Sequence, residues 1–335
     1  METAVTAPAG SEDRPKRSGG RRAGAWAAGL LLAGVSVVVG CRAADSDGIT
    51  PVPQLLAFLP WLLAPTGLGL LLALFARRRV AMVWGVLVLG ALAWYIEPYG
   101  KTGEPTGSPV AELRVMTSNV QFGQGARALV AAVERHRPDI VFVEECEYTC
   151  SATLKKAFQG PGGGYPYRVS VEGAGSDGSV IISRFPLAMA DGVRGTMGMP
   201  GAVADVRGHS VRLQLAHPMP PLPGQVGLWR HELGELRDYA AGGKDSSTIL
   251  AGDFNASQDH AAFRRVLDTG LRDSTRLAGS PRTPSWPART APALGAQIDH
   301  VLVSRDFSAN AATFLGIAGS DHRALIVDIT LHQHK

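Results

Sequence analysis

The chain has 335 residues, of which 45% are hydrophobic and 19% are charged, and its formal net charge is +4. This length and apolar content exclude a disordered polymer and allow more than one folded unit. Residues 108–335 carry 23 basic and 22 acidic residues. Such near-neutrality argues against a protein that tracks a nucleic-acid backbone, because phosphate contacts need a basic face.

Three uncharged apolar blocks lie near the N-terminus: 23–41, a middle block that ends at Ala76, and 80–96. A bilayer core about 30 Å thick takes about 17 to 25 helical residues, so each block is long enough to span it. Pro60 and Pro65 interrupt the middle block, which a membrane helix tolerates where its neighbours satisfy the freed carbonyl groups. The sequence therefore predicts a bundle of three transmembrane helices over residues 23–98.

Basic residues flank these blocks unevenly. Five lie between positions 14 and 22, and three more at 77–79 join the second block to the third. Because basic flanks stay on the cytoplasmic side, residues 1–22 are predicted to be a cytoplasmic tail, and the chain after Tyr95 is predicted to be extracytoplasmic. An alternative interpretation makes residues 1–41 a signal peptide, and it also leaves the C-terminal part of the chain outside the cell membrane.

Residues 99–111 are predicted to form a linker, because Gly, Pro, Thr and Ser dominate there. Over residues 112–335, short apolar runs bounded by turn residues alternate with amphipathic stretches, which predicts a layered α/β sandwich with mixed sheets. The predicted strands are 113–118, 140–143, 179–183, 211–215, 248–251, 298–303 and 325–329, and the predicted helices are 127–135, 228–239 and 261–267.

Polar residues stand at the ends of most of these strands. In a layered α/β protein, side chains at strand ends converge on a common crevice. Carboxylate, amide and imidazole groups at one crevice suit a hard divalent cation, Mg²⁺ or Mn²⁺, together with a phosphate, because carboxylates hold the cation and imidazoles move protons. The residues concerned are Asn119, Glu144, Glu145, His217, Asp253, Asn255, Asp299, His300, Asp321 and His322.

Other kinds of catalytic site have no matching motif. The sequence has no His-x-x-x-His zinc motif, no Gly-x-x-x-x-Gly-Lys-[Ser/Thr] phosphate loop and no Gly-x-Ser-x-Gly nucleophile motif. Metal-assisted hydrolysis of a phosphate ester is therefore the chemistry that the polar residues favour.

In their order along the chain, these polar segments resemble the motifs of the endonuclease/exonuclease/phosphatase superfamily, whose fold is the DNase I-like αββα sandwich. A three-residue motif is weakly specific alone, whereas seven in the family order are specific together. They are Thr-Ser-Asn-Val at 117–120, Pro-Asp-Ile-Val-Phe-Val-Glu-Glu at 138–145, Ile-Ser-Arg-Phe-Pro at 182–186, His-Pro at 217–218, Gly-Asp-Phe-Asn at 252–255, Ile-Asp-His-Val at 298–301 and Gly-Ser-Asp-His at 319–322.

The resemblance implies a divalent cation, Mg²⁺ or Mn²⁺, bound by Glu145 with the help of Asn119 and Asp321. It also implies that His322, oriented by Asp299, acts as a general base or as a phosphate ligand. Charges and donors placed where the transition state needs them are the main contribution of a protein to phosphoryl transfer.

The same resemblance implies roles for three further residues. Asp253 would orient the attacking water and Asn255 would hold a phosphoryl oxygen. His217 would stabilise the pentacovalent transition state or protonate the leaving oxygen. His300 and Glu144 are interpreted as residues that pack beside the site or support it.

With the three predicted spans included, the chain is similar to membrane-anchored VanJ-type members of the superfamily, which are associated with teicoplanin resistance. This similarity implies hydrolysis of a cell-wall lipid carrier, such as undecaprenyl pyrophosphate, at the outer face of the cell membrane. One alternative is a surface nuclease or phosphodiesterase, which near-neutrality and the presence of Gln121, where some members have a second acidic ligand, make less favourable. The other is a catalytically inactive domain that binds a lipid or an antibiotic.

Two further segments beside the predicted site allow two interpretations each. Cys146 and Cys150 form a disulfide if they lie in a loop of an oxidising compartment, and they remain two buried thiols otherwise. The proline-rich apolar segment 218–229 either contacts lipid, through residues such as Met219 and Leu222, or is a rigid connection that covers the core.

Overall fold

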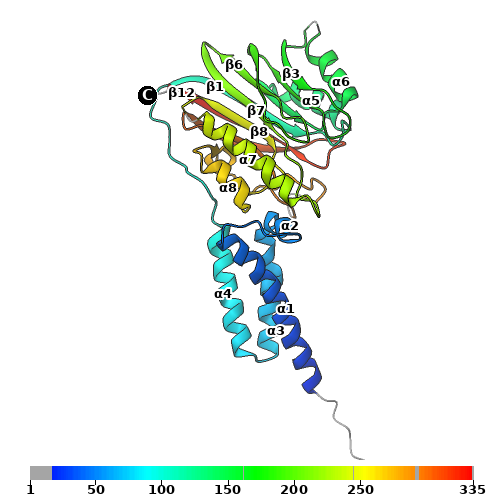
Figure 1. Ribbon diagram of the computed structural model, residues 1–335, viewed down its shortest axis with the longest axis vertical. Helices are drawn as coiled ribbons and strands as arrows, with labels where there is room; N and C mark the ends of the chain where they lie inside the picture. The colour runs from blue at the N-terminus through cyan, green and yellow to red at the C-terminus, as the bar shows by residue number, and fades with distance from the viewer. Residues whose placement is uncertain (1–16, 161, 244, 291–293, 334–335) are drawn as a thin grey trace, which may run out of the picture.

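The computed structural model describes residues 17–335 apart from residues 161, 244, 291–293 and 334–335. Residues 1–16, which make up most of the predicted cytoplasmic tail, lie outside the described residues. The described chain forms a helical bundle and a layered sandwich, and an extended segment runs from the last bundle helix to the sandwich (Figure 1).

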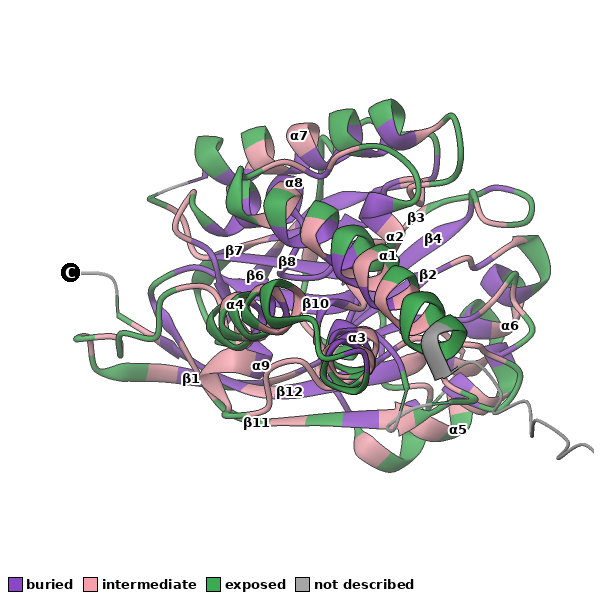
Figure 2. Ribbon diagram, turned by 90° about the horizontal axis from the view of Figure 1, so that it is seen from below, coloured by how far each residue is buried: buried purple, intermediate pink, exposed green. Residues whose placement is uncertain are grey.

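The bundle consists of three helices packed side by side, with a short helix at the end nearest the sandwich (Figure 1). Its outward surface is largely exposed when the molecule is viewed along the bundle (Figure 2). The elements are α1 (Arg17–Ala43), α2 (Val52–Ala57), the 3-10 helix η1 (Leu59–Leu62), α3 (Leu63–Phe75) and α4 (Arg79–Ile96).

Two helices of the described chain are long and apolar enough to cross a membrane, Gly19–Ala43 and Arg79–Ile96. The third predicted span is not confirmed, because the middle block forms a separate α2 and the shorter apolar helix Leu59–Phe75. Proline accounts for the division. Pro53 is the second residue of α2 and Pro60 lies in η1, and neither residue has the amide hydrogen that a continuous helix needs.

The sandwich contains two mixed sheets of six strands. One sheet has the order β11-β12-β1-β2-β4-β3 and the other β5-β6-β7-β8-β10-β9. The pairs β1–β2 and β7–β8 are parallel, and the remaining pairs are antiparallel. The strands are β1 (Pro109–Asn119), β2 (Ile140–Glu144), β3 (Tyr167–Val171), β4 (Ser179–Ser183), β5 (Leu187–Ala190), β6 (Gly201–Val206), β7 (His209–Ala216), β8 (Thr248–Asp253), β9 (Arg272–Asp273), β10 (Asp299–Val303), β11 (Phe307–Gly316) and β12 (Arg323–His332).

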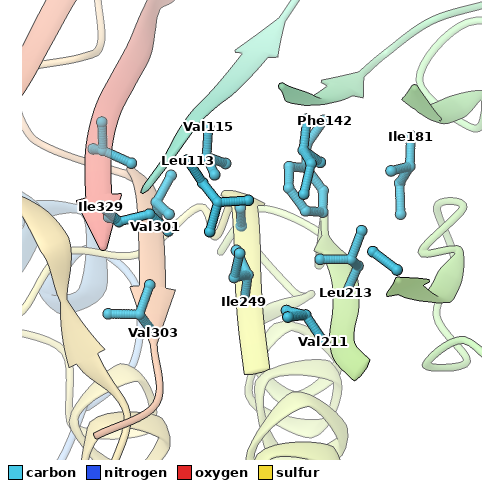
Figure 3. Packing of buried hydrophobic residues seen from close by; sticks show 14 of the residues in the cluster. Leu113, Val115, Phe142, Ile181, Val211, Leu213, Ile249, Val301, Val303 and Ile329 are labelled. Atoms are coloured by element: carbon cyan, nitrogen blue, oxygen red, sulfur yellow. The ribbon is translucent and has the colours of Figure 1, made fainter. Parts of the chain in front are cut away.

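Five helices accompany the strands, and four of them cover the outer faces of the sheets. On β1, the alternating residues Leu113 and Val115 belong to the core between the sheets, whereas Met116 packs with Leu129 and Val133 of α5. Figure 3 shows side chains from both sheets meeting in that central core. The helices are α5 (Ala126–His136), α6 (Tyr148–Phe158), α7 (Val226–Gly242), α8 (Ala261–Leu267) and α9 (Ser274–Leu277).

The outer layers confirm the predicted fold class. α5 and α6 share a buried cluster with the first sheet, and α7 and α8 share one with the second sheet. The order of layers is therefore helix, sheet, sheet, helix, as the αββα prediction states. Both faces of each sheet are covered, which explains why β2, β4 and β10 read as continuous apolar runs rather than as alternating patterns.

Buried polar contacts join the bundle to the sandwich. Residues 44–58, between α1 and η1, are called the docking segment below. Its Asp47 is 2% exposed and accepts hydrogen bonds from the backbone amides of Ala261, at 2.6 Å, and Ala262, at 3.1 Å, at the start of α8. Asp45 forms ion pairs with Arg264 at 2.5 Å and Arg265 at 3.3 Å. These contacts fix α8 above the end of the bundle.

Candidate active site

Strand pairing brings the strand-end residues to one edge of the sandwich. β1 and β2 are parallel, so Asn119 pairs with Glu144 in register and Glu145 follows directly. In the second sheet, Asp299 at the start of β10 pairs with Asp253 at the end of β8. β12 runs antiparallel to β1, which places the residues just before β12 at the same edge.

The Asn119 side chain connects the two sheets. Its Nδ2 donates hydrogen bonds to Glu145 Oε1 and to Asp253 Oδ2, both at 3.1 Å, and its Oδ1 accepts one from the Gln121 amide at 2.9 Å. The Phe122 amide donates to Glu145 Oε2 at 3.0 Å. Gln121, Phe122 and Glu145 all have positive φ angles, of 46°, 52° and 55°. The backbone therefore turns sharply just after Asn119 and again at Glu145. The Gln121 and Phe122 amides donate their hydrogens to side chains of the site.

His322 lies between two buried carboxylates. Its Nδ1 is 2.9 Å from Asp299 Oδ2, and its Nε2 is 3.6 Å from Asp253 Oδ2. Burial alone would lower the pKa of this imidazole, but the charges of Asp299 and Asp253 outweigh it and raise the pKa of His322 to about 10. Burial raises the pKa of Asp253 to about 7. In the absence of a bound cation, the imidazole is therefore a charged hydrogen-bond donor at neutral pH.

His217 and Asn255 complete the side of the site formed by β7 and β8. His217 is 1% exposed, and its Nε2 lies 3.9 Å from Glu145 Oε1. Burial lowers the pKa of His217 to about 3, and the charge of nearby His322 lowers it further. Asn255 has a φ of 48°, and its Nδ2 donates to the Pro218 carbonyl at 3.0 Å.

Asp321 is oriented by an indole that the sequence analysis did not select. Trp286 Nε1 donates a hydrogen bond to Asp321 Oδ2 at 3.0 Å. The Ser285 hydroxyl beside it accepts from the Asp299 amide at 3.1 Å, and Ser320 Oγ donates to the Asn119 carbonyl at 2.7 Å. Ser320 stands inside the last family-like motif and was open to selection there, whereas no local pattern distinguishes Trp286 or Ser285.

The two residues interpreted as supporting ones lie beside the site. Glu144 is fully buried and accepts a hydrogen bond from Thr117 Oγ1 at 2.9 Å. Burial, followed by the charge of Asp299, raises its pKa well above the usual range. His300 Nδ1 is 2.8 Å from Asp273 Oδ2, and its Nε2 is 3.0 Å from the Ala256 carbonyl.

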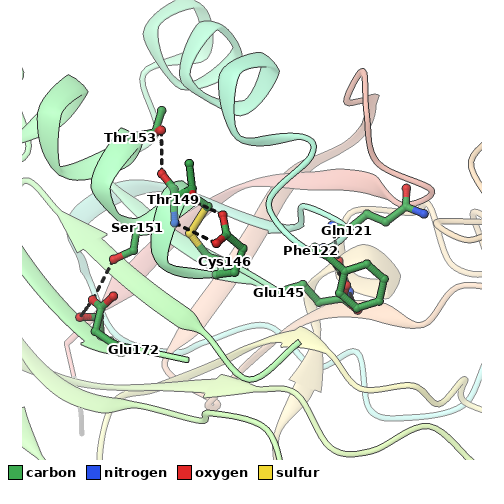
Figure 4. The surroundings of a disulfide bond; sticks show 12 residues. Gln121, Phe122, Glu145, Cys146, Thr149, Ser151, Thr153 and Glu172 are labelled. Carbon is green, nitrogen blue, oxygen red and sulfur yellow. Dashed lines mark hydrogen bonds between the residues drawn. A yellow bond between two sulfur atoms is a disulfide. The ribbon is translucent and has the colours of Figure 1, made fainter. Parts of the chain in front are cut away.

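Cys146 and Cys150 form a disulfide, which settles the alternative left open by the sequence (Figure 4). Cys146 follows Glu145 in a loop, and Cys150 lies in the first turn of α6. Glu147 caps that helix by accepting hydrogen bonds from the Thr149 and Cys150 amides, both at 2.9 Å. The bond therefore ties the Glu145 loop to the start of α6.

A pocket of about 670 Å³ opens over this edge, a size suited to a small ligand or headgroup. It gathers the eight residues that the sequence analysis proposed for catalysis and metal binding. Six of them line it, and Asn119 and Asp299 lie behind them, hydrogen-bonded to lining residues. The lining six are Glu145, His217, Asp253, Asn255, Asp321 and His322.

The donor set fits a divalent cation. Asp253, Asp299 and His322 each offer one ligand atom, and these atoms all lie within 4.8 Å of one another. Asp299 Oδ1 is buried without a hydrogen-bond partner among the described residues. Carboxylate oxygens suit a hard cation. This group differs from the predicted ligands Asn119, Glu145 and Asp321, although Asn119 bonds directly to Asp253.

The two-sheet sandwich with an acidic, amide and imidazole site at its strand ends is the architecture of a class of phosphoester hydrolases. Residues 116–322 match the Endonuclease/Exonuclease/phosphatase family. Because the match covers more than half of the chain, the protein belongs to this family, and the predicted superfamily is confirmed. Its members are hydrolases that act on phosphoester bonds, typically with divalent metals. No curated protein sequence matches the chain.

Solved structures share this fold at low sequence identity. A D. rerio TDP2 humanized by 14 mutations has a TM-score of 0.54 and 17% identity, and the match covers 65% of this chain and 98% of that one. An endonuclease/exonuclease/phosphatase from Beutenbergia cavernae has a TM-score of 0.51 and 19% identity, with 67% and 73% of the two chains covered. A family protein from Bacteroides thetaiotaomicron has a TM-score of 0.52 and 15% identity, with 68% and 100% covered.

Proposed function

We propose that the protein is a membrane-anchored, divalent-metal-dependent phosphohydrolase that acts outside the cytoplasm on a lipid phosphate, such as the cell-wall carrier undecaprenyl pyrophosphate. The position of the pocket carries this proposal. Its lining includes six residues between positions 50 and 58 of the docking segment, which lies at the sandwich end of the apolar bundle (Figure 1). A phosphate headgroup at the surface of a membrane around the bundle would meet the strand-end carboxylates directly.

The surface of the bundle supports a membrane anchor. Only 28% of the most apolar stretch of α1 and 17% of that of α4 are buried within the protein. Large apolar side chains are exposed on both helices, including Trp26 at 75%, Leu87 at 67% and Trp94 at 78%. Exposed apolar side chains on long apolar helices are stable against lipid rather than against water.

The residues of the site have different roles in the proposed hydrolysis. Glu145, with Asn119 and Asp321, would hold a divalent cation, and Asp253, Asp299 and His322 form a second group whose ligand atoms lie within 4.8 Å of one another. When bound, such a cation supplies positive charge to a phosphoryl group and lowers the pKa of a water molecule. Asp253 accepts a proton or hydrogen bond from the attacking water, and His217 offers an N–H to a phosphoryl oxygen or to the leaving oxygen.

A nuclease is the second candidate, because one of the similar structures is D. rerio TDP2 complexed with a single-strand DNA product, at a TM-score of 0.53 and 17% identity. Against it, residues 108–335 carry 23 basic and 22 acidic residues. The docking segment also forms a wall of the pocket on the bundle side, where a polynucleotide would approach the plane of a membrane.

The decisive experiment assays the full-length protein in lipid nanodiscs with Mg²⁺ or Mn²⁺. The substrates are undecaprenyl pyrophosphate, a phosphodiester lipid, and single- and double-stranded DNA. We expect hydrolysis of the pyrophosphate lipid and loss of that activity in Glu145→Ala and His322→Ala. Cleavage of DNA alone would replace the proposal by the nuclease, and activity that survives both substitutions would remove the site assignment.

A contribution to teicoplanin-type resistance is the physiological part of the proposal. Expression of the chain in a teicoplanin-sensitive bacterium should raise the inhibitory concentration of teicoplanin. Expression of the Glu145→Ala variant at the same level should not raise it. An equal rise with both proteins would show that hydrolysis is not the cause.

A further inference from the structure

The docking segment lines part of a pocket whose carboxylates and imidazoles come from the sandwich. Six of its residues line the pocket together with the strand-end residues. The active-site pocket is therefore assembled from two distant parts of the chain. The six residues are Thr50, Pro51, Pro53, Gln54, Ala57 and Phe58.

Contacts on several sides hold this wall in place. The Pro53 carbonyl is 2.8 Å from His260 Nε2, and the Gln54 amide donates to the Pro221 carbonyl. The Phe58 ring packs on Trp286 with 6.2 Å between ring centroids. Just beyond the segment, Trp61 Nε1 donates to the Gly295 carbonyl at 2.9 Å. The wall thus has a fixed position relative to the catalytic residues.

The proline-rich segment that follows His217 adjoins the docking segment, through the Gln54–Pro221 hydrogen bond, and also lines the pocket. Residues 219–223 line the pocket, and the Met219 amide is anchored by a 2.7 Å hydrogen bond to Glu232 Oε2. Leu222 lines the pocket and is 46% exposed. Segment 218–229 had two interpretations, lipid contact and rigid cover. An exposed apolar side chain that lines the pocket supports lipid contact.

The pocket lining therefore has two chemically different parts. Carboxylates and imidazoles come from the sandwich, whereas prolines, Ala57, Phe58 and Leu222 supply apolar surface. Leu55 of α2 and Leu63 at the start of α3, near these lining residues in the chain, are also exposed, at 38% and 40%. An amphiphile with a phosphate at one end and a hydrocarbon chain at the other matches this arrangement.

We propose that the six pocket-lining residues of the docking segment and residues 219–223 together form a binding site for the hydrocarbon chain of the substrate, and that this site selects long-chain lipid phosphates over soluble ones. The inference rests on the proposed function, because it needs a lipid phosphate as the substrate. It adds that the bundle side of the chain determines specificity as well as location. The phosphate is held by the sandwich, and the first part of the chain is held by the segment beside the bundle.

A chain-length series tests the inference in the full-length protein in nanodiscs. The substrates are undecaprenyl pyrophosphate, farnesyl pyrophosphate and a water-soluble aryl phosphate. Phe58→Ala removes apolar surface from the pocket lining, and Ala57→Phe places a larger side chain at a lining position. Because burial of one large apolar side chain is worth about 1.5 to 3 kcal/mol, we expect each variant to lower the ratio of kcat/KM for the longest to the soluble substrate by about tenfold or more.

Ile49→Ala is the matched control. Ile49 lies in the same segment and is 76% exposed, but it does not line the pocket, so its removal should leave the ratio unchanged. A ratio that falls equally in Ile49→Ala, or that stays constant in both wall variants, would overturn the inference. A wild-type protein that hydrolyses no lipid phosphate would instead overturn the proposed function, and the inference with it.

A second readout does not depend on turnover. A benzophenone-labelled polyprenyl phosphate, irradiated with the protein in the absence of divalent cations, should crosslink to residues 50–58 and 219–223, as identified by mass spectrometry. Unlabelled undecaprenyl phosphate should compete for these crosslinks, whereas inorganic phosphate should compete far less. Crosslinks confined to the outward faces of α1 and α4 would show that the chain stays in the bilayer.

Discussion

Asp321 shows how one side chain of the site depends on a neighbour outside the family-like motifs. Its Oδ2 accepts the indole hydrogen of Trp286, and the Trp286 ring packs against Phe58 from the docking segment. A carboxylate that is oriented by a donor loses less freedom when it binds a cation, so partners of this kind tune the affinity of a metal site.

Replacing Trp286 by Phe removes this donor and keeps most of the ring. We expect the Mn²⁺ concentration that gives half-maximal activity to rise by about tenfold, within the range seen for residues that orient metal ligands. The measurement is a Mn²⁺ titration of hydrolysis. Trp61→Phe is the control, because it also loses an indole hydrogen bond, but to the backbone carbonyl of Gly295. An equal shift in both variants would show that Trp286 acts only through packing.

His260 makes the contact between sandwich and docking segment sensitive to acid. Burial lowers the pKa of this imidazole, which accepts a hydrogen bond from the Ser257 amide at 2.9 Å and lies 2.8 Å from the Pro53 carbonyl. The folded protein therefore favours the neutral form. The unfolded chain binds a proton near pH 6.5, so this contribution to stability is complete above that pH and is lost as the pH falls below it.

We expect the thermal unfolding temperature to fall between pH 7 and pH 5 by less in His260→Gln than in the wild type, because glutamine has no proton to gain. His231→Gln is the control, since that imidazole is 70% exposed. Unfolding curves at both pH values check the prediction. An identical acid shift in wild type and His260→Gln would assign the effect to other groups.

Among the elements, those with strong apolar patterns were predicted well. β4 and α8 have the predicted bounds, and β2 and β7 differ by one or two residues at their ends. Buried strands carry their signal locally, in runs of apolar residues between turns. Elements with weaker apolar patterns were not predicted. β11 is an edge strand whose side chains are mostly partly exposed, so its alanines and asparagine form no apolar run.

The site could be predicted only to the extent that its residues belong to motifs. The strand-end residues were found because pairing and family order both place them at one edge of the sandwich. Trp286, Ser285 and the docking segment were missed for a different reason. Their contacts join positions more than two hundred residues apart, or loops without a pattern, and nothing in a local window of sequence indicates such neighbours.

The disulfide connects two elements, because it joins the loop after β2 to the first turn of α6. Replacing both Cys146 and Cys150 by Ser should lower the free energy of unfolding by about 2 kcal/mol, the loop-closure value for so short a ring. It should also lower hydrolysis, because Glu145 precedes Cys146. Denaturant unfolding and activity assays check both effects. Cys41→Ser is the control, since Cys41 is free, and equal behaviour of the two variants would contradict the expected role of the bond.

At the level of the whole molecule, the sandwich is fixed on the bundle by more than its linker. Asp259 pairs with Arg282 at 2.5 Å and with Arg42 of α1 at 3.7 Å. Arg282 also donates to the carbonyls of Tyr95 and Ile96 at the end of α4. These buried contacts involve both α1 and α4, so the pocket keeps one orientation toward the bundle. A flexible tether would not maintain a wall of the pocket from the docking segment.

Asp47 is the residue by which this arrangement is best tested. Its carboxylate binds the first amides of α8, and a carboxylate at a helix start is worth about 0.5 to 2 kcal/mol. We expect Asp47→Ala to release the docking segment, with faster amide hydrogen exchange over residues 44–58 and a smaller preference for lipid over soluble substrates. Asp205→Ala is the matched control, because Asp205 accepts the Gly208 amide in an exposed turn. If Asp47→Ala leaves both exchange and preference unchanged, the segment is held by its other contacts alone, and the orientation of the pocket does not depend on this carboxylate.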